Sequence, residues 1–226
     1  MAPVVRITNL DKTFHLHQQG SIRIPVLAGF SAEIGTGEAV AVTGPSGRGK
    51  SSLLKLIYGS YRATGGAVRV WHEEDWVDVA TAAPREVLAV RRRTIGYVTQ
   101  FLRVIPRVPA EVIVAEPLLD RGIPQETALE RARHLLARLG IPQRLWHLSP
   151  MTFSGGEQQR VNIARGFAAA FPVLLLDEPT ASLDSANRSR VLDLIEEARA
   201  AGSAIIAVFH DDAERRRACS REIALG

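Results

Sequence analysis

Short, uninterrupted runs of hydrophobic residues alternate along this chain with segments in which hydrophobic residues recur at helical spacing. A run without alternating polar positions is typical of a strand that is buried on both faces of a sheet. Four such runs are Ala39–Thr43, Ile95–Thr99, Val173–Leu176 and Ala204–Phe209. Between the last two, Ser185–Ala201 has the hydrophobic period of a helix, and Gly202 follows it as a stop signal. This order of elements predicts an α/β core with a mainly parallel sheet.

Two other segments depart from that pattern. Val68–Trp71 and Trp76–Val79 flank the charged turn His72–Asp75, which predicts an antiparallel hairpin. The segment Pro109–Pro150 has no strand pattern, and its hydrophobic residues recur at helical spacing up to Gly140. We therefore expect a single domain over residues 1–226. It would have a core of about 1–100 and 155–226, an antiparallel β subdomain within that core, and an inserted helical subdomain of about 101–154.

Composition narrows the class of protein. The chain has 226 residues, of which 46% are hydrophobic and 23% charged, as in ordinary globular proteins. Its single cysteine, Cys219, excludes an internal disulfide. Charged residues stand at the start of the chain, so no secretory signal is indicated there. The longest apolar stretch, Gly166–Leu176, is far below the ~18 residues needed to span a bilayer. We expect a soluble, cytoplasmic protein with no direct membrane insertion.

The net charge of +4 comes mostly from arginine, because only three of the 28 basic residues are lysines. Codon usage and a partner that carries phosphate or acidic groups both account for such an excess, and charge alone does not choose between them. The run Arg91–Arg93 is better explained by a solvated helix end or a protein contact than by nucleic acid. No nucleic-acid partner is expected.

A glycine-rich segment after the first strand carries the clearest chemistry. It matches the P-loop pattern G-x-x-x-x-G-K-[ST] and consists of Gly44, Pro45, Ser46, Gly47, Arg48, Gly49, Lys50 and Ser51. Glycines let the backbone turn tightly enough for its N–H groups to face phosphate oxygens, and the helix expected from Ser52 adds a favourable dipole. Lys50 is expected to reach the β- and γ-phosphates of ATP, and the Ser51 hydroxyl to bind Mg²⁺. We count Ser52 with this nucleotide site.

Two carboxylates end the hydrophobic run at Val173–Leu176. Asp177 is thereby delivered to the edge of the sheet beside the P-loop, where it can hold the Mg²⁺ shell through water. Glu178, the next residue, is placed to activate the attacking water as a general base. Taken alone, two acids after a strand are as well explained by a solvated loop, but the upstream P-loop favours the catalytic interpretation.

A third motif lies between these two and introduces a family resemblance. Phe153 is followed by Ser154, Gly155, Gly156 and Glu157 just before the acidic strand. This arrangement resembles the nucleotide-binding domain of ABC ATPases, which have a P-loop NTPase (RecA-like) core and an L-S-G-G-Q-type signature in this place. Phe153 stands for the usual leucine and Glu157 for the usual glutamine.

The resemblance implies roles for residues elsewhere in the chain. Gln100 matches the Q-loop glutamine, which contacts Mg²⁺ and the attacking water, and His210 matches the switch histidine at the γ-phosphate. Asp184 ends a match to the D-loop (Ser182–Asp184), which communicates across a dimer, and we place it with the nucleotide site. Phe14 matches the aromatic residue that stacks on adenine, although a place in the core explains Phe14 equally well.

The family resemblance further implies that two such domains pair head to tail. ATP would be held between Lys50 of one subunit and Ser154–Gly156 of the other, so hydrolysis should be weak in a monomer. The second subunit would be another copy of this chain or a sibling ATPase.

Four segments are distinctive beyond the general motifs: 14–19, 100–107, 145–150 and 209–211. They resemble the PhnL family of ATP-binding proteins from the bacterial phosphonate-utilisation (carbon–phosphorus lyase) system. This resemblance implies soluble lyase core subunits as partners, and a role in converting phosphonate and ATP to ribose 1-phosphonate 5-triphosphate. Arg103 and Arg107, beside the Q-loop, would meet an acidic soluble subunit or a transporter segment, or are simply solvated.

Two other functions stay open at this point. The chain would otherwise be the ATP-hydrolysing motor of an ABC transporter, of the phosphonate-import or lipoprotein-release type. A third possibility is a nucleotide-dependent structural switch that hydrolyses ATP slowly.

Overall fold

The computed structural model describes residues 2–16, 22–102 and 106–225. Within these ranges, five strands form a sheet in the order β6-β7-β8-β3-β9, and every neighbouring pair is parallel. The strands are β6 (Ile95–Val98), β7 (Val173–Asp177), β8 (Ala204–Val208), β3 (Ala39–Thr43) and β9 (Arg221–Ala224). The first four confirm the four hydrophobic runs to within one residue at each end. The predicted α/β core with a mainly parallel sheet is therefore correct.

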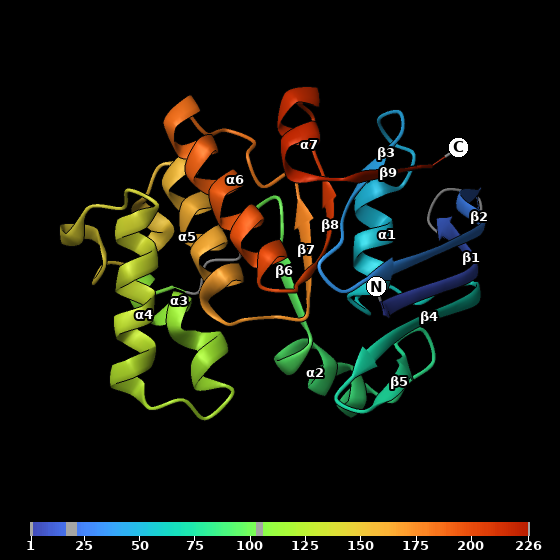
Figure 1. Cartoon of the computed structure of the whole chain (residues 1–226), viewed down its shortest axis with the longest axis horizontal. Coiled ribbons are helices and arrows are strands. Elements are labelled where there is room, and N and C mark those ends of the chain that lie inside the picture. The colour runs from blue at the N-terminus through green and yellow to red at the C-terminus, as the bar shows by residue number, and fades with distance from the viewer. Residues whose placement is uncertain (1, 17–21, 103–105, 226) are drawn as a thin grey trace.

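Helices cover both faces of this sheet, as Figure 1 shows. On one face lie α5 (Gly155–Ala168) and α6 (Ser185–Ala200), and on the other lies α1 (Lys50–Ile57). A hydrophobic core lies on each face of the sheet, and alternate residues of β7 belong to one or the other. Leu174 packs with α5 and α6, while Leu175 packs with α1. Because both faces are buried, the strand shows no alternation of polar and hydrophobic residues.

A second, antiparallel sheet lies beside α1, on the right of Figure 1. Its order is β2-β1-β4-β5, with β1 (Pro3–Leu16), β2 (Ile22–Gly35), β4 (Gly65–His72) and β5 (Asp75–Asp78). The predicted hairpin is β4–β5, in which Trp71 pairs with Trp76. The sequence pattern did not reveal β1 and β2, because their pairing shifts register at several points, for example between Ile7 and Leu10. Each shift interrupts the period of two on which strand recognition depends.

A helical layer at the far left of Figure 1 packs against α5. It contains α3 (Ala110–Leu119) and α4 (Gln125–Arg138), followed by the 3₁₀ turns η2 (Gln143–Leu145) and η3 (Pro150–Thr152). The hydrophobic face of α4 is buried as the spacing predicted, with Leu135 and Leu136 inaccessible to solvent. Gly140 follows α4 with φ of 69°, a conformation that favours glycine after a helix.

Two further helices complete the fold: α2 (Pro84–Arg93) and α7 (Asp212–Ala218). The arginine run ends α2, and two of its members have partners: Arg91 donates to the carbonyl of Tyr58 at 2.9 Å, and Arg93 pairs with Glu73. None of the helices in the described ranges has the length and apolar character to cross a membrane.

Candidate active site

The loop between β3 and α1 has the conformation that the P-loop pattern predicts. Its glycines at 44, 47 and 49 have φ of 140°, 78° and 87°, a backbone region that residues other than glycine rarely adopt. At Gly49 a Cβ atom would lie 2.2 Å from Cγ1 of Val26, a residue of β2. Glycine is therefore required there for two reasons, backbone conformation and close approach of the antiparallel sheet.

Lys50 begins α1 and folds back over the loop. Its Nζ donates to the carbonyls of Gly44 at 2.7 Å and Pro45 at 3.0 Å. The ammonium group thus sits at the mouth of an exposed loop, at the N-terminus of a helix, where backbone N–H groups and the helix dipole favour an anion. Ser51 and Ser52 follow in the first helical turn.

Asp177, at the end of β7, meets the P-loop across the sheet. The Ser51 hydroxyl donates to its Oδ1 at 2.8 Å, and the Tyr97 hydroxyl donates to its Oδ2 at 3.2 Å. Asp177 is only 4% exposed. Burial raises the pKa of this carboxyl group, and the two hydroxyl hydrogen bonds oppose that rise. Burial and the neighbouring carboxylate likewise raise the pKa of Tyr97.

These donors suit Mg²⁺, which prefers oxygen ligands and usually keeps water and phosphate oxygens around it. A hydroxyl and a carboxylate already lie within hydrogen-bonding distance of each other, so one cation can reach both Ser51 and Asp177. Among the described residues, no group of three His, Cys, Asp or Glu side chains is arranged as a complete metal site. The arrangement fits a cation held jointly by the protein and a nucleotide, which is the mode predicted for Ser51 and Asp177.

Glu178 stands between the other two predicted catalytic residues. Nε2 of Gln100 donates to its Oε2 at 2.9 Å, and Nε2 of His210 lies 2.7 Å from its Oε1. The three side chains follow the neighbouring strands β6, β7 and β8, whose carboxyl ends meet at one edge of the parallel sheet. Glu178 has φ of 53°, and its side chain is 14% exposed. The structure therefore brings the proposed base, the Q-loop glutamine and the switch histidine together.

The signature segment lies elsewhere on the chain. Ser154 caps α5 and exchanges hydrogen bonds with Glu157: its N and Oγ each donate to Oε2 at 2.8 Å, and N of Glu157 donates back to Oγ at 3.3 Å. These bonds lower the pKa of Glu157. Phe153, in place of leucine, is buried in the core. Over the described residues, the structure gives no hydrogen bond between Ser154–Gly156 and the P-loop.

Asp184 is the N-cap of α6 rather than a contact of the P-loop. Its Oδ1 accepts from N of Asn187 at 2.8 Å, and this bond lowers the pKa of the Asp184 carboxyl group. The D-loop nevertheless adjoins the signature segment, since a Cβ atom on Gly156 would lie 3.2 Å from the carbonyl oxygen of Ser182.

Phe14 is half-buried on β1. Its ring meets that of Tyr61 edge to face, with centroids 5.3 Å apart, and Nζ of Lys12 lies 4.6 Å from its centre. The antiparallel sheet that carries Phe14 also carries Val26, which touches Gly49, so the aromatic pair is on the sheet beside the P-loop. Its contact with adenine stays a prediction.

Sequence reasoning missed Tyr97 and Val26 as parts of this site. Tyr97 lies on the predicted strand Ile95–Thr99, but a strand buried on both faces gives no sign of which side chains point to the site. The contact of Val26 with Gly49 depends on β2, which the pattern did not reveal. Of the distinctive segments, residues 17–19 and 103–105 lie outside the described residues, Arg103 among them, and Arg107 is exposed.

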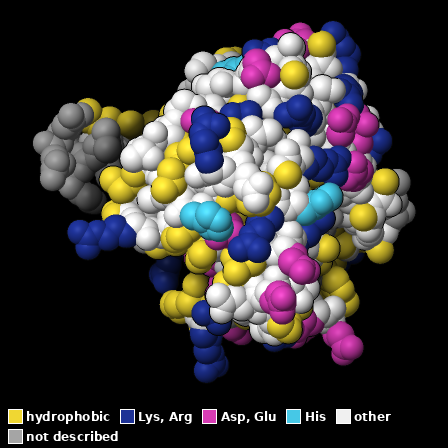
Figure 2. Space-filling model, turned by 90° about the vertical axis from the view of Figure 1, so that its left-hand side faces the viewer, with side chains coloured by type: hydrophobic (Ala, Val, Ile, Leu, Met, Phe, Trp, Pro, Cys, Tyr) yellow, Lys and Arg dark blue, Asp and Glu magenta, His cyan; other side chains and the backbone are white. Residues whose placement is uncertain are grey.

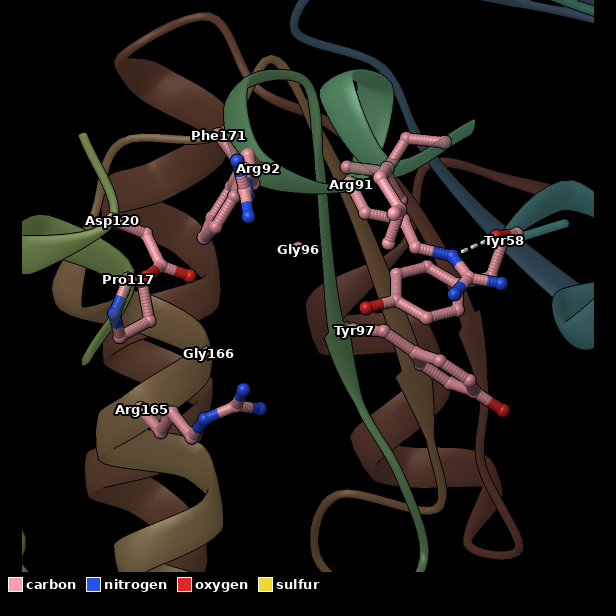
Figure 3. Close-up of a pocket in the computed structure, with 12 residues that line it drawn as sticks. Tyr58, Arg91, Arg92, Gly96, Tyr97, Pro117, Asp120, Arg165, Gly166 and Phe171 are labelled. Atoms are coloured by element: carbon pink, nitrogen blue, oxygen red, sulfur yellow. Dashed lines mark hydrogen bonds between the residues drawn. The ribbon is translucent and has the colours of Figure 1, made fainter. Parts of the chain in front are cut away.

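A groove runs along β6 between α2 on one side and α3 and α5 on the other, with a volume of about 260 Å³ (Figure 3). Arg91, Arg92 and Arg165 line it together with one acid, Asp120, so its polar lining is mainly basic. Gly96 permits the close packing at its floor, because a Cβ atom there would lie 2.6 Å from the Phe171 ring. Figure 2, by contrast, shows basic side chains scattered among acidic and hydrophobic ones over the face of the helical layer.

Comparison with known proteins now identifies the family. A family model described as ABC transporter matches residues 27–181, which is more than half of the chain. The chain belongs to the ABC transporter ATP-binding family. It is therefore an ATP-binding ATPase domain, with the P-loop NTPase fold that the resemblance implied. A solved dimeric structure of the ATP-binding cassette MJ0796, bound to ADP and Pi in a post-hydrolysis state, superposes with a TM-score of 0.88 at 32% identity, covering 98% of this chain and 94% of that one.

Curated relatives of two kinds resemble this ABC domain. The lipoprotein-releasing system ATP-binding protein LolD of Maricaulis maris is 42% identical, over 91% of this chain and 88% of LolD. The macrolide export ATP-binding/permease protein MacB of Brucella melitensis is 37% identical, over 92% of this chain but 31% of MacB. The chain thus spans about a third of the length of the MacB relatives it matches, and most of the length of LolD.

Proposed function

We propose that this chain is the ATP-hydrolysing motor subunit of an ABC transporter similar to the lipoprotein-release and macrolide-export systems. One observation carries the proposal: the basic groove lies along β6, and β6 leads directly to Gln100, whose side chain binds Glu178. A partner seated in the groove would therefore act on the proposed general base through a single strand. The names and the nearly full-length alignment of the LolD relatives support the same interpretation.

Hydrolysis requires the site residues in the following roles. Glu178 accepts the proton of the attacking water, while Gln100 and His210 fix the carboxylate by the contacts already present. Lys50 leaves the loop carbonyls to bind the phosphates. Ser51 and Asp177 would hold Mg²⁺, which when bound neutralises charge on the phosphate oxygens. Positioning and electrostatic stabilisation then supply most of the rate acceleration.

A second ABC subunit completes the site in this proposal. Ser154–Gly156 and the P-loop share no hydrogen bond within the described part of the chain, yet both belong to the expected nucleotide site. Pairing of two subunits head to tail resolves this, because each P-loop would face the signature segment of the other. The dimeric state of the MJ0796 structures supports the arrangement.

The transporter proposal replaces the phosphonate assignment. The relatives reported above are named for lipoprotein release and macrolide export. They give no support to a PhnL-type subunit or to soluble carbon–phosphorus lyase partners. In our proposal, the partner that occupies the groove is a membrane-embedded transporter subunit.

Co-purification from detergent-solubilised native membranes tests the proposal. The full chain, tagged and loaded with ATP, should retain an integral membrane protein, and that protein should raise ATP turnover when it is added back in lipid. Recovery of soluble phosphonate-processing subunits, or of a membrane protein that leaves turnover unchanged, would overturn the proposal. Turnover that stays low with and without every recovered partner would favour the slow nucleotide switch.

A further inference from the structure

Three side chains outside the predicted site tie the loop after Glu178 to the start of α7. The Thr180 hydroxyl donates to a carboxylate oxygen of Glu214, on α7. Nη1 of Arg188, on α6, lies 3.6 Å from the other oxygen of that carboxylate. Nε of Arg188 also donates to the carbonyl oxygen of Leu183 at 2.7 Å. One arginine and one glutamate thus connect the loop, α6 and α7.

The hydroxyl and the carboxylate of this network are shielded from water, whereas the Arg188 side chain is 45% exposed. Thr180 is 5% exposed, and the side chain of Glu214 is 12% exposed. A hydroxyl or carboxylate in such surroundings costs free energy if its partner is removed, because water does not fully replace the lost contact. A cavity of about 130 Å³ adjoins the network, and Glu178 and His210 line the same cavity.

The loop that the network holds is strained. Glu178 and Ser182 have φ of 53° and 65°. Residues other than glycine adopt this backbone conformation only when their surroundings hold them in it. Thr180 and Leu183, which the network binds, lie within this loop. Their anchoring therefore bears directly on the direction in which the Glu178 side chain points.

The other end of the network lies behind His210. Helix α7 starts two residues after His210, and Asp211 caps it by accepting from N of Ala213 at 2.7 Å and N of Glu214 at 3.1 Å. The cap thus joins the residue next to His210 directly to the backbone of Glu214. Contacts that fix Glu214 therefore also limit the position of His210.

We propose that Glu214 and Arg188 are positioning residues for ATP hydrolysis. They join the loop of Glu178 to the helix behind His210 and so keep the 2.7 Å contact between the Glu178 and His210 side chains. Through the same network, any movement of that helix is passed on to the D-loop. Neither residue touches the nucleotide. This inference rests on the proposed catalytic roles of Glu178 and His210.

A double-mutant cycle tests the coupling. Glu214→Gln keeps an acceptor for Thr180 but loses the charge that faces Arg188, and Arg188→Met removes the other half of the pair. Each single variant should lower kcat for ATP roughly tenfold with little change in KM, and the double variant should be no slower than the slower single variant. Thr180→Val, which is nearly isosteric, should reproduce the kcat loss if either charge variant fails to fold.

A matched control lies on the same two helices. Arg217, one turn after Glu214 on α7, pairs with Asp193 and Glu196 on α6 at 2.5 and 2.8 Å and donates to the Ser189 hydroxyl at 3.2 Å. Arg217→Met therefore weakens the α6–α7 contact without touching Thr180 or Leu183, and it should leave kcat unchanged. If Arg217→Met slows hydrolysis as much as Arg188→Met, the network only holds the helices together and the proposal is wrong.

Failure of the inference can be told apart from failure of the proposed mechanism. If Glu178→Gln abolishes hydrolysis while Glu214→Gln and Thr180→Val retain wild-type kcat, only the positioning role is overturned. If Glu178→Gln itself hydrolyses ATP normally, the role of Glu178 is wrong and the inference falls with it.

Discussion

The hydroxyl of Ser51 donates to Oδ1 of Asp177 at 2.8 Å, across 126 positions of sequence. This bond joins the P-loop to the end of β7 and gives a nearly buried carboxylate one of its few polar partners. Burial leaves the negative charge of Asp177 poorly solvated and thereby raises the pKa of its carboxyl group. A cation bound beside Ser51 would relieve that unfavourable charge.

Asp177→Asn should stabilise the nucleotide-free protein at neutral pH. A carboxyl group whose pKa is raised on folding contributes stability below its ordinary pKa of 3.8, and that contribution is lost as the pH rises through the raised value. The amide carries no charge. Whichever of the Ser51 and Tyr97 hydroxyls faces its NH2 group can turn to accept, while the other hydroxyl keeps donating to its oxygen. In thermal unfolding experiments, the melting temperature of the variant should rise relative to that of the wild type between about pH 4 and about pH 8.

The same Asp177→Asn variant should lose Mg²⁺-dependent ATP hydrolysis, since a neutral amide is a poorer Mg²⁺ ligand than a carboxylate. A variant that is less stable than the wild type at high pH, and that hydrolyses ATP with unchanged Mg²⁺ dependence, would contradict both expectations.

Glu178→Gln should bind ATP but hydrolyse it slowly. The amide can still contact Gln100 and His210 but cannot accept a proton, so turnover should fall by a factor of about 10² to 10⁴. Phosphate release measures turnover, and equilibrium binding of a fluorescent ATP analogue measures affinity. An exposed carboxylate on the antiparallel sheet, Glu33, supplies the control, because Glu33→Gln should leave both quantities unchanged.

Gly49→Ala should weaken ATP binding more than Gly47→Ala. Both glycines have positive φ, but only at position 49 would the new Cβ meet another atom, Cγ1 of Val26 at 2.2 Å. Backbone strain of about 1 kcal/mol is expected in each variant, with the clash added only in Gly49→Ala. Isothermal titration with ATP checks the difference. Adding Val26→Ala should recover part of the loss at position 49 and none at position 47.

Arg92→Glu should reduce association with the transporter's membrane subunit while leaving basal ATP hydrolysis unchanged. Arg92 lines the groove, and reversing its charge opposes any acidic partner segment there. Arg85→Glu, on the same helix but outside the groove, is the control and should associate normally. Equal effects of the two substitutions on co-purification would indicate a general charge effect, contrary to a specific role of the groove.

Much of the parallel core was readable from the sequence, because each of its four predicted strands is buried on both faces and appears as an unbroken hydrophobic run. The exception, β9, is a four-residue edge strand with exposed residues, so it has no such run. In the antiparallel sheet, bulges broke the alternation of β1 and β2. The P-loop was readable because its residues are contiguous and their chemistry depends on local backbone conformation.

The catalytic cluster depended on more than local pattern. Glu178, Gln100 and His210 are widely separated in sequence, and only the family resemblance suggested that they act together. Their meeting at one edge of the sheet follows from the parallel order β6-β7-β8, which places three carboxyl ends side by side. No spacing rule within the chain encodes that neighbourhood.

By itself, the sequence determined the α/β class, the phosphate-binding loop and membership of the ABC family, since each of these is carried by short contiguous runs or motifs. The finer PhnL assignment that the sequence suggested found no support in the relatives. Only the tertiary structure decided which side chains surround Asp177 and Glu178, where the basic groove lies, and how Thr180, Arg188 and Glu214 join two catalytic loops. Those features arise from packing between distant segments, where a contact depends on strand order and on the space that glycines leave open.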